Sequence, residues 1–140
     1  MAAPPLAVVG IDERTNTLER YSGKVVLLNF WGVSCAHCLA HMPRLDELAE
    51  RHADRGLVVL SVCADEDDLA IATDALAAAG AATERAHVDR TGLATARYEV
   101  GVLPTVYLID RAGRVVARST GAQDWVSAPH AAMIEALLAE

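Results

Sequence analysis

The chain lacks the long apolar runs of membrane proteins and the Lys/Arg clusters of nucleic-acid-binding proteins. None of its hydrophobic stretches approaches the roughly 18 residues that a membrane span requires. Its formal net charge is −7, which a phosphate backbone would repel, so no nucleic-acid partner is expected. It has only three cysteines, which excludes a framework of structural disulfides, and no internal repeats.

The first residues also lack the basic segment and the apolar stretch of a secretion signal. Either the protein is cytoplasmic or a leader has been removed. The 140 residues, 53% of them hydrophobic and 22% charged, suffice for one globular domain with a single core. We therefore expect one monomeric domain over residues 1–140, with residues 1–7 flexible.

Two of the cysteines, Cys35 and Cys38, lie where a strand is expected to give way to a helix. Residues 24–30 form a nearly continuous apolar run, typical of a strand buried on both faces, and apolar residues recur at helical spacing after Cys38. At a helix N-terminus the free N–H groups favour an anion, so Cys35 is expected to ionise readily and attack, with Cys38 closing the disulfide. The same spacing makes half a structural zinc site, but zinc needs four ligands and Cys63 has no near partner.

The rest of the chain alternates short strands and helices. The expected elements are an edge hairpin within 8–22, a buried strand over 57–63, a helix ending at Gly80, a strand near 86–88, a helix over 91–98, an antiparallel hairpin of 105–110 and 114–119, and a last helix. The acidic run 65–68 is interpreted as the N-terminal cap of the second helix, not as a metal site. In the last helix, Pro129 suits the first turn and Met133 belongs to the apolar face.

Further motifs resemble the thioredoxin superfamily. They are Trp31 before the cysteines, Pro43 after them, and Val102-Leu103-Pro104-Thr105 ahead of a strand. Other segments are similar to its TlpA/ResA-like branch of extracytoplasmic thiol–disulfide oxidoreductases, some of which serve cytochrome c maturation. These segments are Gly23-Lys24-Val25-Val26, Asn29-Phe30-Trp31, Met42-Pro43, Tyr98-x-Val100 and Leu108-Ile109-Asp110-Arg111-x-Gly113. The resemblance implies an α/β thioredoxin-like fold with a central mixed β-sheet flanked by helices, an N-terminal β-hairpin and a central strand–helix insertion.

The resemblance also implies roles for residues outside the cysteine motif. Pro104 would form a cis peptide bond facing the disulfide, leaving the backbone of Leu103 free to pair with an extended substrate peptide. Gly121 would line the same substrate groove, and Trp31 would give an apolar wall beside the cysteines. Cys63, late in a buried strand, is interpreted as a small inert hydrophobe.

Three residues near the cysteines are candidate modulators. His37 and His41 are four residues apart on the expected helix, so both can face the sulfurs, although His37 can instead point into water. A cationic imidazole there would favour the ionised, reduced form and make the disulfide more oxidising. Thioredoxin proper has an acid where this chain has Asn29, which cannot act as a base, and the TlpA/ResA-like branch commonly has an acid where this chain has His41.

The sequence thus predicts a thiol–disulfide oxidoreductase that acts on protein substrates, is reset by a redox partner, and needs no metal or organic cofactor. One alternative is a thiol peroxidase-like antioxidant enzyme, which would activate a single cysteine with Thr and Arg, whereas here Ser34 precedes Cys35. Another is a copper-carrying module that uses Cys35, Cys38 and His37 or His41. The resemblance favours a periplasmic or extracytoplasmic soluble domain, tethered to a membrane in a longer protein; a cytoplasmic location is the alternative.

Overall fold

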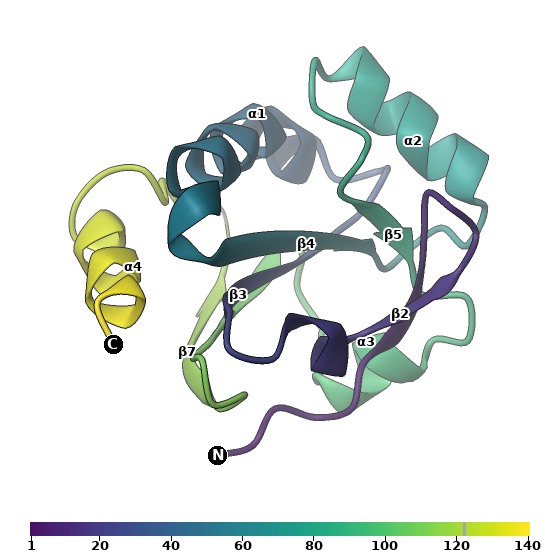
Figure 1. Cartoon of the computed structure of the whole chain (residues 1–140). Coiled ribbons are helices and arrows are strands. Elements are labelled where there is room, and N and C mark those ends of the chain that lie inside the picture. Colours follow the sequence, from purple (N-terminus) through teal and green to yellow (C-terminus); the bar gives the residue numbers. More distant parts are fainter. Residues whose placement is uncertain (122) are drawn as a thin grey trace.

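The computed structural model describes residues 1–121 and 123–140 and contains a seven-stranded sheet with helices on both faces (Figure 1). In chain order the elements are β1 Ala7–Gly10, β2 Thr15–Thr17, η1 Leu18–Tyr21, β3 Val25–Trp31, α1 Ala36–His52, η2 Ala53–Arg55, β4 Leu57–Cys63, α2 Leu69–Ala78, β5 Ala86–Val88, α3 Leu93–Arg97, β6 Thr105–Ile109, β7 Val115–Thr120 and α4 His130–Leu138. No helix of the described residues is long and apolar enough to cross a membrane.

The strand order across the sheet is β2-β1-β5-β4-β3-β6-β7. β3, β4 and β5 run parallel, whereas β6 is antiparallel to β3 and to β7, so the expected mixed sheet is confirmed. The N-terminal hairpin of β1 and β2 joins the sheet through β5, which lies between β1 and β4. The segment from β5 to α3 is the expected strand–helix insertion.

β3 is an interior strand of the sheet, and this position explains why its sequence is almost continuously apolar. Side chains alternate between the two faces of a strand, and both faces of this sheet are covered. One face of β3 packs into a core with α1, α2 and α4, and the other into a core with α3 and the N-terminal segment. Asn29 is the one polar residue of β3, and it contacts Met42 of α1.

The predicted acidic cap of α2 is confirmed, whereas two predicted details of α4 are wrong. Within the acidic run, it is Asp68 that caps α2, accepting a hydrogen bond from the Ala70 N–H at 2.9 Å, while Asp65 binds elsewhere. In α4, Pro129 is the N-cap and Met133 is 39% exposed. The buried stripe of α4 passes through Ile134, Leu137 and Leu138, and a residue one position before Ile134 is turned about 100° away from it.

The N-terminal residues expected to be flexible contact the turn between β6 and β7. The Ala3 N–H donates to the Gly113 carbonyl at 2.9 Å, and the Leu6 side chain is buried.

Arg111, in the same turn, joins three segments that are distant in the sequence. Its guanidinium donates to the carbonyl of Gly23 at 3.0 Å, of Arg55 at 3.0 Å and of Leu138 at 2.9 Å. These contacts fix the end of α4 to the segments that precede β3 and β4. The cysteines follow the opposite, carboxyl end of β3.

Candidate active site

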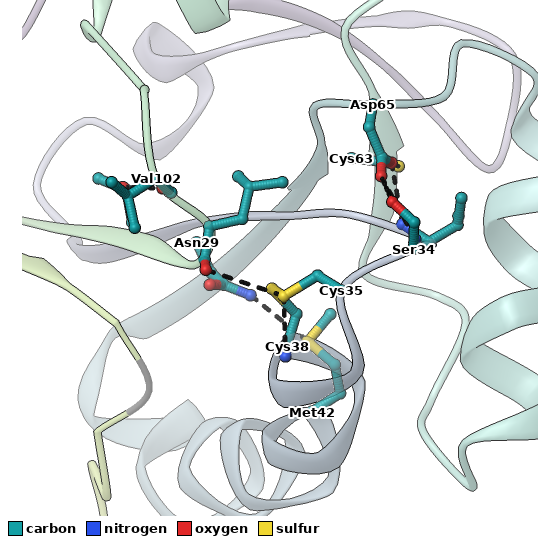
Figure 2. The surroundings of a disulfide bond; sticks show 11 residues. Asn29, Ser34, Cys35, Cys38, Met42, Cys63, Asp65 and Val102 are labelled. Atoms are coloured by element: carbon teal, nitrogen blue, oxygen red, sulfur yellow. Dashed lines mark hydrogen bonds between the residues drawn. A yellow bond between two sulfur atoms is a disulfide. The ribbon is translucent and has the colours of Figure 1, made fainter.

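Cys35 and Cys38 form a disulfide at the start of α1 (Figure 2). Cys35 is the N-cap residue, and its Sγ accepts a hydrogen bond from the Cys38 backbone N–H at 3.2 Å. N–H groups at a helix start have no partner within the helix, and this one is directed at the sulfur on which a thiolate charge would form. Cys35 is half-buried, whereas Cys38 is only 2% exposed. An attacking thiol and a resolving thiol require this difference in access.

The loop before β6 faces Cys35. The Leu103–Pro104 peptide bond is cis, as expected from the resemblance, and the Leu103 carbonyl oxygen lies 3.8 Å from the Cys35 Sγ. Val102, immediately before it, is 54% exposed. The backbone of Leu103 is therefore the polar group beside the accessible sulfur, where an extended peptide can pair with it.

A small hollow lies beside Cys38. Its lining residues are Asn29, Cys38, His41, Leu45, Pro104, Val106, Gly121, Gln123 and Trp125. Gly121, in the left-handed region at φ +81°, donates its N–H to the Pro104 carbonyl at 2.9 Å. The predicted groove residue Gly121 thus lies next to the cis-proline.

Trp125 is a site residue that sequence reasoning missed. It is 4% exposed, lines the hollow, and packs edge-on against the His130 ring with the ring centroids 4.6 Å apart. An aromatic residue in the connection between β7 and α4 was the available signal, but no periodic pattern assigned it to a face.

The two candidate modulator histidines lie in different environments. His41 is half-buried and lines the hollow with Cys38, whereas the His37 side chain is exposed and does not line it. The structure therefore brings His41, and not His37, to the surface around Cys38. Its position three residues after Cys38 on α1 places the two on the same helix face.

Asn29 and Trp31 support the disulfide from within the core. Asn29 is 2% exposed, and its Nδ2 donates to the Met42 Sδ and the Ser61 Oγ, both at 3.4 Å. Trp31 is fully buried in the core cluster that contains Cys38. Trp31 is thus an apolar wall behind the cysteines and offers no surface to a substrate.

Asp65 contacts the peptide units immediately before Cys35, and sequence reasoning missed this as well (Figure 2). Its carboxylate accepts hydrogen bonds from the Val33 N–H at 2.9 Å, the Ser34 N–H at 3.3 Å and the Ser34 hydroxyl at 2.6 Å. Partial burial works to raise the pKa of Asp65, but the bonds from Ser34 and Val33 outweigh it and bring this pKa below its ordinary value. Asp65 is thus held as an anion beside the loop.

Cys63 lies at the end of β4, within reach of Asp65. It is a free, fully buried cysteine whose thiol donates to the Asp65 Oδ1 at 3.4 Å. Burial raises the pKa of the Cys63 thiol to about 11. Because nucleophilic attack requires the thiolate, the raised pKa and the burial of Cys63 both support its interpretation as an inert residue.

Known proteins are similar to this chain over most of its length. A model of the AhpC/TSA family matches residues 1–118. The thiol-disulfide oxidoreductase ResA of Bacillus thuringiensis (strain Al Hakam) is 34% identical over 121 residues, 86% of this chain and 69% of that protein. ResA of Geobacillus thermodenitrificans (strain NG80-2) is 34% identical over 119 residues, 85% of this chain and 67% of that protein.

Two solved structures extend the similarity. The crystal structure of a putative thiol:disulfide interchange protein DsbE from Chlorobium tepidum has a TM-score of 0.87 at 27% identity, over 98% of this chain and 95% of that one. The pneumococcal exposed lipoprotein thioredoxin Etrx1 from Streptococcus pneumoniae strain TIGR4 has a TM-score of 0.75 at 27% identity, over 98% of this chain and 100% of that one.

Proposed function

This chain belongs to the AhpC/TSA family of thioredoxin-like proteins and is a thiol–disulfide oxidoreductase, and we propose that it acts on protein substrates through Cys35 and Cys38. The observation that carries the proposal is the Cys38 N–H directed at the sulfur of the more accessible Cys35. A thiolate formed there is stabilised by that hydrogen bond and by the start of α1.

The exchange balances without any further reactant. In the reduced protein the Cys35 thiolate attacks one sulfur of a substrate disulfide, and the other substrate sulfur leaves with the electron pair and takes up a proton. Cys38 then loses its proton and attacks the Cys35 Sγ, and the substrate sulfur still bound to Cys35 leaves with the electron pair of that bond and takes up a proton. The substrate gains two electrons and two protons, and the protein is left with its disulfide. The reverse sequence oxidises a substrate dithiol.

The substrate class follows from the surface around Cys35. We assign the Leu103 backbone as the strand-like partner of an extended segment of the substrate, with the exposed Val102 beside it. We further propose that no metal or organic cofactor takes part, because the Cys35–Cys38 pair itself carries the two electrons as a dithiol and is left as a disulfide once it has given them up. A separate redox partner must then reset the cysteines between turnovers.

We propose an extracytoplasmic location for this domain, with a membrane anchor or leader in the full-length protein. Its similarity to the TlpA/ResA-like branch and to a pneumococcal protein described as an exposed lipoprotein supports this location. Detection of the native protein in a periplasmic or membrane fraction, with a cytoplasmic marker absent from that fraction, tests it.

Variants of the two cysteines, each made in a Cys63→Ser background, test the assignment of roles. Cys38→Ser should accumulate a mixed disulfide between Cys35 and insulin, used as a disulfide-bonded polypeptide, because the resolving thiol is gone. Cys35→Ser should trap none. Non-reducing electrophoresis and mass spectrometry detect the adduct, and equal trapping by both variants would contradict the roles.

The same protein distinguishes the two alternatives. A thiol peroxidase would consume hydrogen peroxide in the presence of dithiothreitol faster than it reduces insulin, and the Cys38→Ser variant would retain much of that activity. A copper carrier would bind Cu(I) tightly in its reduced form. Within the described residues no three His, Cys, Asp or Glu side chains are grouped so as to hold a metal ion.

A further inference from the structure

We infer that Asp65 is a positioning residue for Cys35: by holding the peptide units of Val33 and Ser34, it keeps Cys35 at the N-cap of α1. This inference rests on the proposed function and deepens it. It assigns a task to an acid that lies 30 residues after Cys35 in the sequence and on a different strand end.

The sheet brings Asp65 to this loop. β3 and β4 are parallel and in register, so that Trp31 and Cys63, their last residues, are neighbours. The pairing continues one step further, since the Ala64 N–H donates to the Trp31 carbonyl at 2.8 Å. After β4 and Ala64, the next residue in the chain is Asp65. After β3, the next residues are those that lead to Cys35. The carboxylate therefore meets the loop at the point where both strands end.

The Asp65 carboxylate binds the loop through both its backbone and a side chain. The Asp65 carboxylate accepts from two consecutive N–H groups, those of Val33 and Ser34, and also from the Ser34 hydroxyl. Two adjacent N–H groups on one carboxylate fix the orientation of both peptide planes, and bonds to a charged acceptor are stronger than those between neutral groups. The Ser34 hydroxyl, at 2.6 Å from the carboxylate, uses its proton in this bond.

The loop is also closely packed at Gly32. A Cβ on Gly32 would lie 2.5 Å from the Asp65 Oδ2 and 2.8 Å from the Leu103 Cδ1. Asp65 and the residue before the cis-proline therefore leave no room for a side chain at this point of the segment. Because the Cys35 N–H donates back to the Gly32 carbonyl at 3.1 Å, a shift of residues 32–34 is transmitted to Cys35 and to its bond with the Cys38 N–H.

Asp65 has two opposing effects on a Cys35 thiolate, and they predict opposite results. As a fixed negative charge it disfavours the thiolate, whereas as an anchor of the loop it preserves the N–H bond that favours it. A positioning residue is one for which the second effect is larger. Removing the side chain should then make Cys35 harder to ionise, although a negative charge has been removed.

The test compares Asp65→Ala, Asp65→Asn and Ser34→Ala with Asp67→Ala as a matched control. Asp67 is an exposed acid in the same segment, and its removal changes the net charge equally. Thiolate absorbance of the reduced proteins gives the pKa of Cys35, and the reaction with Ellman's reagent at pH 7 gives its rate of attack. Cys63, with its pKa of about 11, titrates separately.

We expect Asp65→Ala to raise the pKa of Cys35 by about one unit, which slows its attack about tenfold below that pKa. Asp65→Asn, which can accept from only one of the N–H groups, should fall between the native protein and Asp65→Ala. Ser34→Ala, which keeps both N–H bonds, should shift the pKa in the same direction but less. Asp67→Ala should match the native protein.

A lowered Cys35 pKa in both Asp65 variants would overturn the inference, because the charge would then dominate. Values equal to those of Asp67→Ala would overturn it too. If Asp65→Ala does not fold, as judged by its circular dichroism, an unshifted Ser34→Ala would overturn it and a raised pKa in that variant would support it. Failure of the proposed function looks different, since the native protein itself would then not exchange with insulin.

Discussion

Replacing Asn29 by Asp is expected to make the stability of the protein depend on pH in a way that the native chain's does not. Asn29 is 2% exposed and lies between the Met42 sulfur and the Ser61 hydroxyl, neither of which carries a positive charge. A carboxylic acid fits this space and can donate one hydrogen bond. A carboxylate there would lose its water shell and gain only the hydroxyl as a donor.

The magnitude follows from burial. Fully buried carboxyl groups have a pKa raised by about 3–5 units, and a rise of about three units from about 3.9 would bring the pKa of the introduced carboxyl near neutrality. Each unit corresponds to about 1.4 kcal/mol. Because the folded-state pKa is the higher one, the folded protein binds more protons than the unfolded chain between the two values, and stability falls as pH rises. The variant should therefore be close to native stability near pH 4 and about 4 kcal/mol less stable at pH 8.

Urea unfolding of the oxidised proteins at several pH values measures this difference relative to the native protein at the same pH. Asn29→Ser is the control, since it disturbs the same contacts without adding an ionisable group, and its deficit should not vary with pH. In the reduced Asn29→Asp variant the new carboxylate also lines the hollow beside Cys38 and can accept its proton, so resolution of the mixed disulfide should become faster. A stability deficit that is the same at pH 4 and pH 8 would refute the reasoning about this buried position.

The other predictions concern the surface and reactivity of the site. Pro104→Ala should weaken exchange with insulin, while the variant stays folded in a thermal unfolding measurement. Full exchange activity in this variant would show that the substrate does not bind at Leu103 and Pro104. His41→Ala should make the reduction potential more negative by about 30 mV if the attraction between imidazole and thiolate is about 1.4 kcal/mol. Replacing the exposed His37 by Ala should leave the potential unchanged. Glutathione titrations that give equal shifts for the two variants would contradict this distinction. Cys63 should resist iodoacetamide at pH 8 in the folded protein and react in urea, as followed by mass spectrometry; rapid modification of the native state would mean that it is accessible.

Much of the fold could be predicted because its signals are local. The continuous apolar runs of β3 and β4 report strands covered on both faces, and the cysteines stand at a change of period from strand to helix. The short turn between β6 and β7 permits only an antiparallel hairpin. In each case the residues that form the sequence pattern also form the strand, helix or turn that it predicts.

The missed features depend on partners that are distant in the sequence. Asp65 belongs to an acidic run of the kind that caps a helix. The register of β3 against β4, which the sequence does not show, places it beside the loop before Cys35 instead. His37 and His41 are four residues apart on α1, so spacing alone lets both face the sulfurs, but the hollow that Gly121 and Trp125 help to line includes only His41. Periodicity identifies a face of a helix and does not say what covers it.

The hydrogen bonds of Arg111 and the disulfide lie at opposite ends of β3, so the residues at the two ends can be altered separately. The seven residues of β3 separate these bonds from the disulfide by roughly 20 Å, beyond the range of about 7–10 Å within which mutational effects usually interact. Substitutions that change the redox potential can therefore accumulate around the disulfide, while the contacts of Arg111 maintain enough free energy of unfolding for the protein to tolerate them. For protein engineering, the contacts of Arg111 mark the end at which compensating stability can be added without changing the thiol chemistry.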